Sequence, residues 1–279
     1  MSDRLFVQLQ HLLPKLLITR LLGFLASRRG GALTQWVICR FVACYNVNMA
    51  EAERRDASAY LTFNDFFTRA LRSGARPQAA AQLVCPVDGT ISQCGRIMGN
   101  QIFQAKGKSF DSCALLAGDK ELAHQFKNGL FATLYLSPRD YHRVHMPCDG
   151  KLLSMSYVPG KLYSVNPATT RGVGALFARN ERVVCHFDSA HGPFVLVLVG
   201  AAIVGGIATV WHGVVSPPRS SRVRHWDYRN SEIKLTQGEE MGRFLLGSTV
   251  VLLFPQGPLQ LNADWLPMRT VRLGEAMAS

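Results

Sequence analysis

Acidic residues are scarce in this chain, which has 19 Asp and Glu residues against 31 Lys and Arg among its 279 residues. The formal net charge of +12 favours an anionic partner, such as nucleic acid, an acidic membrane surface or a phosphorylated substrate. Charged residues make up only 18% of the chain and hydrophobic residues 48%, which argues against extended disorder. The length suits one large domain with a hydrophobic core, or at most two small domains.

Two chemical signatures are missing as well. The chain contains no Gly-x-Ser-x-Gly sequence, so the nucleophile elbow of an α/β-hydrolase is absent. The cysteines are odd in number, and no pair has the spacing of a zinc site, so we expect reduced, mostly buried thiols of a cytosolic protein. They are Cys39, Cys44, Cys85, Cys94, Cys113, Cys148 and Cys185.

The first 50 residues contain a single acid, Asp3, and are rich in Leu and Phe. Their basic residues are Arg4, Lys15, Arg20, Arg28, Arg29 and Arg40. Basic and apolar residues together are typical of a segment that lies on a membrane surface. A nucleic-acid-binding segment would interleave its basic residues with polar ones. We therefore predict an anionic phospholipid membrane as a partner, and no nucleic acid.

The apolar spacing over Leu5–Leu25 predicts two short amphipathic helices, the second with Pro14 in its first turn. Lys15 and Arg20 interrupt the apolar run, so it suits neither a secretory signal nor a membrane-spanning helix. We predict an anchor that lies in the membrane plane; packing of the two helices on the protein's own core is the alternative. Helix is expected to continue over residues 36–70, with the charged residues at 51–56 on a solvated face.

The pattern changes after residues 74–77, and from Val84 onward short β-branched and aromatic runs are bounded by turn residues. Examples are Leu130–Leu136, Gly150–Tyr157 and Arg182–Phe187. Phe194–Trp211 has no charge and is long enough to span a membrane, but its Val, Ile and Gly content predicts two buried strands joined by a tight bend. We predict an α+β protein: membrane-associated helices over residues 1–70, then a largely antiparallel β core over residues 71–279.

The bond between Gly247 and Ser248 has the composition of a self-cleaving site. The serine hydroxyl can attack the carbonyl before it, and this N-to-O acyl shift converts the amide to an ester. The attack passes through a crowded five-membered ring, in which glycine at position 247 removes a Cβ clash. Elimination then leaves dehydroalanine, and hydrolysis gives a pyruvoyl group, an electron sink built from the chain itself. By itself, Gly-Ser-Thr before a strand is more commonly a turn.

A titratable cluster supports the chemical interpretation. His142 and His145 lie three residues apart, and an imidazole suits taking a serine proton and later delivering one to a carbanion. Asp88, in a Pro-Val-Asp-Gly sequence, is either part of a β-turn or an acid that orients a histidine. Zinc binding by the two histidines with Asp140 or Cys148 is disfavoured, since the set lacks a recognisable metal spacing.

Several short motifs occur in a fixed order along the chain. They are residues 63–69 (FNDFFTR), 86–89 (PVDG), 104–107 (QAKG), 141–147 (YHRVHMP), 158–160 (VPG), 164–167 (SVNP), 180–182 (NER) and 247–249 (GST). In this combination the chain resembles the bacterial phosphatidylserine decarboxylases, pyruvoyl-dependent enzymes made as a single proenzyme, from about Tyr60 to Glu275. Two residues depart from the expected pattern: Lys161, where an acidic or polar residue is expected, and Val87, where Ala is as common.

The resemblance implies a role for each candidate residue. Ser248 becomes the pyruvoyl group, His145 is the base that activates it, and Asp88 orients His145. His142 lies near the substrate head group and assists decarboxylation. Cutting leaves a β chain, residues 1–247, and an α chain, residues 248–279, which stay associated because the α chain begins with a buried strand, Val250–Phe254.

The resemblance also implies the reaction and its place. The amine of phosphatidylserine forms a Schiff base with the pyruvoyl group, carbon dioxide leaves, and phosphatidylethanolamine is released. We expect a homodimer on the cytoplasmic side of the cell membrane, attached peripherally. The alternatives are a lipid esterase that uses Ser, His and Asp, and a pyruvoyl-dependent decarboxylase of a soluble amino acid.

Overall fold

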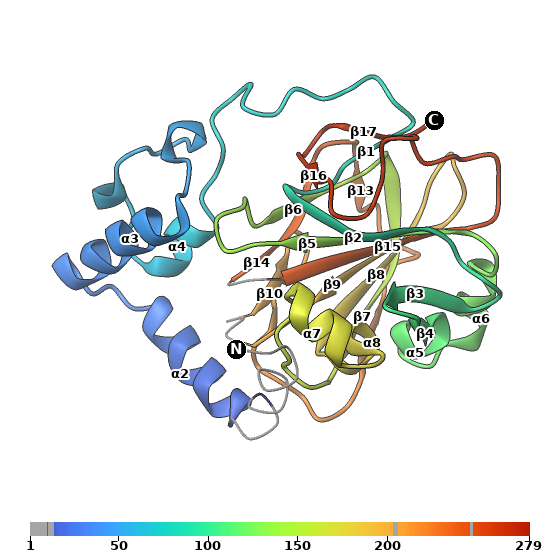
Figure 1. Ribbon diagram of the computed structural model, residues 1–279, viewed down its shortest axis with the longest axis horizontal. Coiled ribbons are helices and arrows are strands. Elements are labelled where there is room, and N and C mark those ends of the chain that lie inside the picture. Colours follow the sequence, from blue (N-terminus) through green and yellow to red (C-terminus); the bar gives the residue numbers. More distant parts are fainter. Residues whose placement is uncertain (1–9, 11–13, 203–205, 246–247) are drawn as a thin grey trace.

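The computed structural model describes residue 10 and residues 14–202, 206–245 and 248–279, with Ser248 described through its backbone. A helical N-terminal region leads into a large β structure, and the helices lie to one side of it (Figure 1). The helical elements of this region are α2 (Lys15–Ala26), α3 (Ala32–Tyr45), the 3-10 turns η1 (Met49–Glu51) and η2 (Ala57–Ala59), and α4 (Phe63–Phe67).

The N-terminal helices agree with the sequence only in part. Pro14 immediately precedes α2, as predicted, whereas the helix predicted before Pro14 lies outside the described residues apart from Gln10. The continuous helix predicted over residues 36–70 is wrong. The observed helix α3 ends at Tyr45, because Asn46 takes a left-handed conformation with φ of 52°. Short turns follow because Asn48 and Asp56 side chains accept backbone N–H groups that a longer helix would bond internally.

Among the described residues, nine strands form one antiparallel sheet in the order β12-β7-β8-β9-β15-β5-β2-β16, with β13 also paired to β7. These strands are β2 (Gly89–Arg96), β5 (Leu130–Leu136), β7 (Gly150–Val158), β8 (Arg182–Asp188), β9 (Phe194–Val199), β12 (Arg224–Asp227), β13 (Lys234–Leu235), β15 (Ser248–Phe254) and β16 (Thr270–Val271). The predicted α+β class with a largely antiparallel core is therefore confirmed.

Smaller sheets complete the described β structure. A four-stranded sheet has the order β11-β10-β14-β6, and β1 pairs with β17 and β3 with β4, all antiparallel. Their bounds are β1 (Leu83–Val84), β3 (Gln101–Ala105), β4 (Lys108–Asp111), β6 (Arg143–His145), β10 (Ile207–Thr209), β11 (Gly213–Ser216), β14 (Glu240–Phe244) and β17 (Ala276–Ala278). The short helices are α5 (Ser112–Leu115), α6 (Lys120–Gln125), α7 (Pro167–Gly172) and α8 (Leu176–Arg179).

The uncharged run Phe194–Trp211 forms buried strands, as predicted. β9 is buried along its whole length at the centre of the large sheet, which explains its unbroken apolar sequence. The second strand, β10, belongs to the four-stranded sheet, so the run connects two sheets rather than forming a hairpin within one. In the described part of the chain, no helix is long and apolar enough to cross a membrane.

The described residues form three hydrophobic clusters. Two of them use the alternate side chains of the large sheet's central strands, so that Leu252 and Val251 of β15, for example, belong to different clusters. The third lies in the N-terminal region and includes Ile38, Tyr60 and Phe66. A separate apolar cluster before residue 70 is compatible with the predicted boundary there, which stays a prediction.

Candidate active site

The start of β15 lies beside the end of β5, from which the chain leads to both candidate histidines. Ser248 begins β15 opposite Leu136, the last residue of β5. Residues 137–142 then lead from β5 to β6, and the His142 carbonyl accepts a hydrogen bond from the Phe244 N–H, 3.0 Å away, at the end of β14. The two chain segments that flank the candidate cleavage site therefore both contact the stretch from Leu136 to His142. Gly247 itself lies outside the described residues.

The connection between β5 and β6 is tightly folded. Asp140 closes a turn on Ser137: its carboxylate accepts the Ser137 N–H at 2.7 Å, and its own N–H donates to the Ser137 carbonyl at 2.9 Å. Burial raises the pKa of the Asp140 carboxyl above its ordinary value, although the Ser137 hydrogen bonds oppose that shift. The turn fixes the direction in which the chain enters β6, and hence the place of His142.

His142 is fully buried and has one open ring nitrogen. Its Nδ1–H donates to the Asp140 carbonyl oxygen at 2.8 Å, and the Phe67 ring lies 4.0 Å away, centroid to centroid. Burial lowers its pKa to about 3, so the ring is neutral at pH 7. Nε2 is buried and has no hydrogen-bond partner among the described residues. A buried acceptor without a hydrogen-bond partner costs free energy, so such an atom is typical of a site that binds a ligand.

His145 is held at both ring nitrogens. Nδ1 lies 2.8 Å from the Gly238 carbonyl oxygen, to which it must donate, and Nε2 therefore accepts from the Tyr141 hydroxyl at 3.0 Å. Burial lowers the pKa of His145 as well, and it raises that of Tyr141. The structure thus presents a neutral imidazole with a basic Nε2 and a tyrosine hydroxyl bonded to it, an arrangement suited to accepting a proton.

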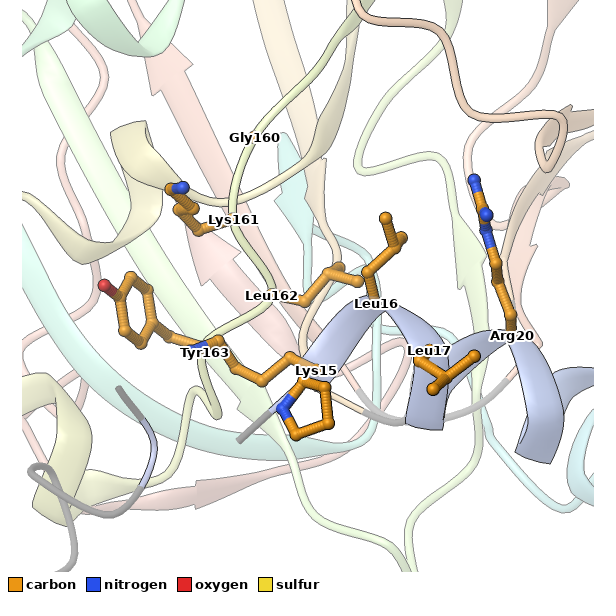
Figure 2. A pocket seen from close by; sticks show the side chains of 9 residues that line it. Lys15, Leu16, Leu17, Arg20, Gly160, Lys161, Leu162 and Tyr163 are labelled. Atoms are coloured by element: carbon orange, nitrogen blue, oxygen red, sulfur yellow. The ribbon is translucent and has the colours of Figure 1, made fainter. Parts of the chain in front are cut away.

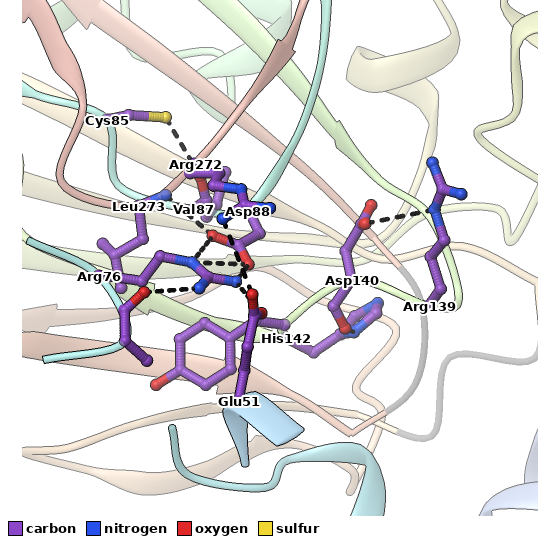
Figure 3. A network of polar contacts seen from close by, with 12 residues as sticks. Glu51, Arg76, Cys85, Val87, Asp88, Arg139, Asp140, His142, Arg272 and Leu273 are labelled. Carbon is purple, nitrogen blue, oxygen red and sulfur yellow. Dashed lines mark hydrogen bonds and ion pairs between the residues drawn. The ribbon is translucent and has the colours of Figure 1, made fainter. Parts of the chain in front are cut away.

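Asp88 lies near this pair but its carboxylate has other partners. The His145 N–H donates to the Pro86 carbonyl oxygen at 2.9 Å, which brings β6 beside the segment that carries Asp88. The Asp88 carboxylate accepts from Arg76 Nε at 2.9 Å and Nη2 at 2.5 Å, and from the Leu273 N–H at 2.9 Å (Figure 3). The described residues include no hydrogen bond between Asp88 and His145, so direct orientation of the histidine by this acid, as expected from the sequence, is absent.

Arg76 is an important residue that the sequence did not reveal. Its guanidinium joins Asp88 to Glu51, whose Oε2 accepts from Nη2 at 2.6 Å, and so connects the N-terminal region to the site (Figure 3). These hydrogen bonds, that to Asp88 above all, raise the pKa of Arg76. In the sequence Arg76 marked only a change of pattern before a proline; its pairing depends on residues 25 and 12 positions away.

Arg69 was also missed as a site residue, although it belongs to one of the quoted motifs. It is buried, and Nη2 donates to the Arg139 carbonyl oxygen at 3.2 Å, which supports the β5–β6 connection. Its positive charge further lowers the pKa of His142. No local pattern around Arg69 distinguishes a buried arginine from a surface one.

The arrangement suits covalent and acid–base chemistry better than metal chemistry. Within the described ranges, no group of three or more His, Cys, Asp or Glu side chains is placed to hold a metal ion. A pyruvoyl group at residue 248 fits the observed surroundings. It would stand at the N-terminal end of a central strand, opposite Leu136, from which the chain leads to the neutral His142 with its open Nε2, and each strand beside it is fixed by backbone pairing.

Comparison with known proteins gives full-length matches. Residues 63–279 match the model of a family described as phosphatidylserine decarboxylase, and residues 5–46 match a second model described as PSD. The chain is 65% identical to the phosphatidylserine decarboxylase proenzyme of Chromobacterium violaceum, over 100% of both chains. It is 66% identical to the protein of the same name from Polaromonas naphthalenivorans, over 100% of this chain and 97% of that one. The corresponding protein of Variovorax paradoxus is 63% identical, over 100% and 99%.

Proposed function

Because this chain belongs to the phosphatidylserine decarboxylase family and is therefore a decarboxylase of that lipid, we propose that it acts through a pyruvoyl group made from its own Ser248. The products are phosphatidylethanolamine and carbon dioxide. The observation that carries the cofactor proposal is a pair of neutral histidines, buried His142 and partly buried His145, on the chain segment that follows Leu136, the partner of Ser248 in β5. The name proenzyme, shared by the relatives, supports a maturation step.

Maturation begins when the Ser248 hydroxyl attacks the Gly247 carbonyl carbon and transfers its proton toward His145. The amide C–N bond breaks as the ester C–O bond forms, and the freed amine stays on residue 248. Elimination then releases the new carboxylate of residue 247, and hydrolysis of the resulting dehydroalanine releases ammonia. The Tyr141 hydroxyl occupies His145 Nε2, so we infer that it relays the proton to that nitrogen. Arg76 donates to the Asp88 carboxylate, which in turn accepts the Leu273 N–H and so fixes the neighbouring backbone.

In turnover the pyruvoyl carbonyl supplies an electron sink for the pair that the departing carboxylate leaves behind. His142 suits the proton transfers. Its Nε2 is free to accept a proton from the substrate ammonium, which must become a neutral amine before it reacts. The same nitrogen can then return the proton to the α-carbon. Because burial lowers the pKa of His142, its protonated form gives up the proton readily, and the substrate carboxylate brought in beside the ring would raise that pKa for the acceptance step.

Strand pairing joins the two chains that cutting would form. β15, the first strand of the α chain, is paired along its length with β5 on one side and β9 on the other, both of which belong to the β chain. Its side chains from Val250 to Phe254 are buried. Separation would break both ladders and expose that apolar surface, so we propose a stable α–β complex.

Membrane attachment is proposed from the surface of the N-terminal helices. Large apolar side chains stand exposed on α2 and α3, among them Leu17, Leu21, Phe24, Leu33 and Trp36. Arg20, Arg28, Arg29 and Arg40 lie in the same region. An apolar surface with basic residues around it suits a helix pair that lies in the plane of an anionic leaflet, here the cytoplasmic one.

A homodimer is proposed from the resemblance, and light scattering of the detergent-solubilised protein tests it.

The decisive experiment combines intact mass with an activity assay. The purified protein should give two fragments, residues 1–247 and 248–279, and the smaller one should lack a free N-terminal amine. Ser248→Ala should give one inactive species of 30.8 kDa. Carbon dioxide release from phosphatidylserine, but not from free serine, would exclude the soluble amino-acid substrate. An uncut parent chain that hydrolyses lipid esters would overturn the proposal in favour of the esterase.

A further inference from the structure

A cleft of about 620 Å³ separates the start of α2 from residues 160–163. Three leucines line the cleft, Leu16 and Leu17 from α2 and Leu162 from the opposite wall, and cationic side chains lie on either side of them (Figure 2). These cations are Lys15, Lys161 and Arg20. None of the described residues that line the cleft is acidic. The cleft therefore offers an apolar floor and an uncompensated positive rim.

The wall that carries Lys161 is rigid. The Lys161 N–H donates to the Arg179 carbonyl oxygen at 2.8 Å, and its carbonyl accepts the Glu181 N–H at 2.9 Å. Asn180 binds the Tyr163 backbone twice, at 3.1 Å through Oδ1 and at 2.9 Å through Nδ2. These bonds fix the place from which the exposed Lys161 side chain reaches the cleft, so less entropy is lost when it binds a ligand.

The opposite wall is tied to the same segment. The buried Gln10 side chain accepts the Ser164 N–H at 2.8 Å and donates to the Thr169 hydroxyl at 2.9 Å. Lys15 Nζ donates to the Gln10 carbonyl oxygen and lies 4.6 Å from the centroid of the Tyr163 ring. Partial burial, and then the charge of Lys161, lower the pKa of Lys15. The two ammonium groups thus raise each other's free energy, and an anion between them would reverse that cost.

We propose that this cleft binds the phosphodiester head group of one anionic phospholipid, with the lipid's glycerol and first methylenes over the three leucines. The inference rests on the proposed contact of α2 with the membrane and names a binding site within it. The apolar floor favours a lipid over a free phosphate ion, which would leave the leucines uncovered. None of Asp88, His142 and His145 is among the described residues that line the cleft, so the site is separate from the reaction.

The test uses monomeric short-chain phosphatidylglycerol, below its micelle concentration, titrated calorimetrically into the full processed protein. The parent should show saturable binding. Lys161→Ala should weaken it about fivefold, as expected for one basic residue at an anionic lipid, whereas Lys161→Arg should retain it. Arg29→Ala is the matched control, since Arg29 is exposed beyond the end of α2 and does not line the cleft, and it should bind like the parent.

Three outcomes would overturn the proposal. If the parent shows no saturable binding, or if the parent and Lys161→Ala bind equally, the cleft does not hold the head group. Equal losses in Lys161→Ala and Arg29→Ala would indicate diffuse surface attraction. Displacement by inorganic phosphate at matched ionic strength would assign the cleft to the free anion. Fragment formation and carbon dioxide release from detergent-dispersed phosphatidylserine, measured on the parent protein, report separately on the proposed function: an uncut or inactive parent overturns that function without bearing on lipid binding in the cleft.

Discussion

Replacement of Arg76 by Met should destabilise the protein far more than the loss of an ordinary surface ion pair. The Arg76 and Asp88 side chains retain only 8% and 10% of their solvent exposure, and their closest atoms are 2.5 Å apart. Removing one partner of such a pair leaves an uncompensated buried charge, at a cost of about 3–5 kcal/mol. Arg54→Met is the control, because the Arg54–Asp65 pair has similar geometry but 44% and 35% exposure, and should cost about 0–1 kcal/mol.

Both substitutions should be made in uncut Ser248→Ala protein, so that a single chain unfolds. Urea unfolding gives the free energies, and the buried pair predicts a drop in melting temperature of about 6–10 °C for Arg76→Met. The double variant Arg76→Met/Asp88→Asn should recover part of the loss, since it removes the orphaned charge. Equal effects of Arg76→Met and Arg54→Met, or a double variant worse than the sum of its parts, would refute the reasoning.

Four further predictions concern the two histidines and Tyr141. His145→Ala should leave the chain largely uncut, and Tyr141→Phe should slow cutting about tenfold by removing the Nε2 hydrogen bond, both read as fragment formation over time by mass spectrometry. His142→Ala should still be cut but turn over about 10²–10⁴ times more slowly in carbon dioxide release; full activity would contradict its proposed role. Burial lowers the pKa of His142 from 6.5 to about 3, so its contribution to the free energy of unfolding should be complete above pH 6.5 and should fall by about 1.4 kcal/mol per pH unit below it. Urea unfolding of the uncut protein measures this slope, and His142→Asn should remove it.

The secondary structure was predictable where a single local pattern dominated. Leu130–Leu136 and Arg182–Phe187 are β-rich runs bounded by turn residues, and both are strands of the large sheet. Residues 46–62 were wrongly predicted as helix, because their charged residues resemble a solvated helix face. Asn48 and Asp56 instead use their side chains to cap short turns, a choice that depends on where the surrounding chain must go.

The candidate site shows the same division. Chemical type and order along the chain singled out Asp88, His142, His145 and Ser248, since few residue types can supply a base, a proton carrier or a nucleophile. The partners of these residues could not be inferred. Gly238 and Tyr141 hold His145, and Arg76 holds Asp88, through contacts up to 93 residues apart in sequence.

By itself, the sequence determined the α+β class, the basic and apolar N-terminus and the residues able to do the chemistry, because these depend on composition, periodicity and functional groups. Only the tertiary structure decided that His142 and His145 are neutral, that Asp88 binds Arg76 instead of His145, and that Lys15 and Lys161 share one cleft. Burial and pairing depend on which strands become neighbours. That choice is made by the packing of the whole chain, so no short segment of sequence contains it.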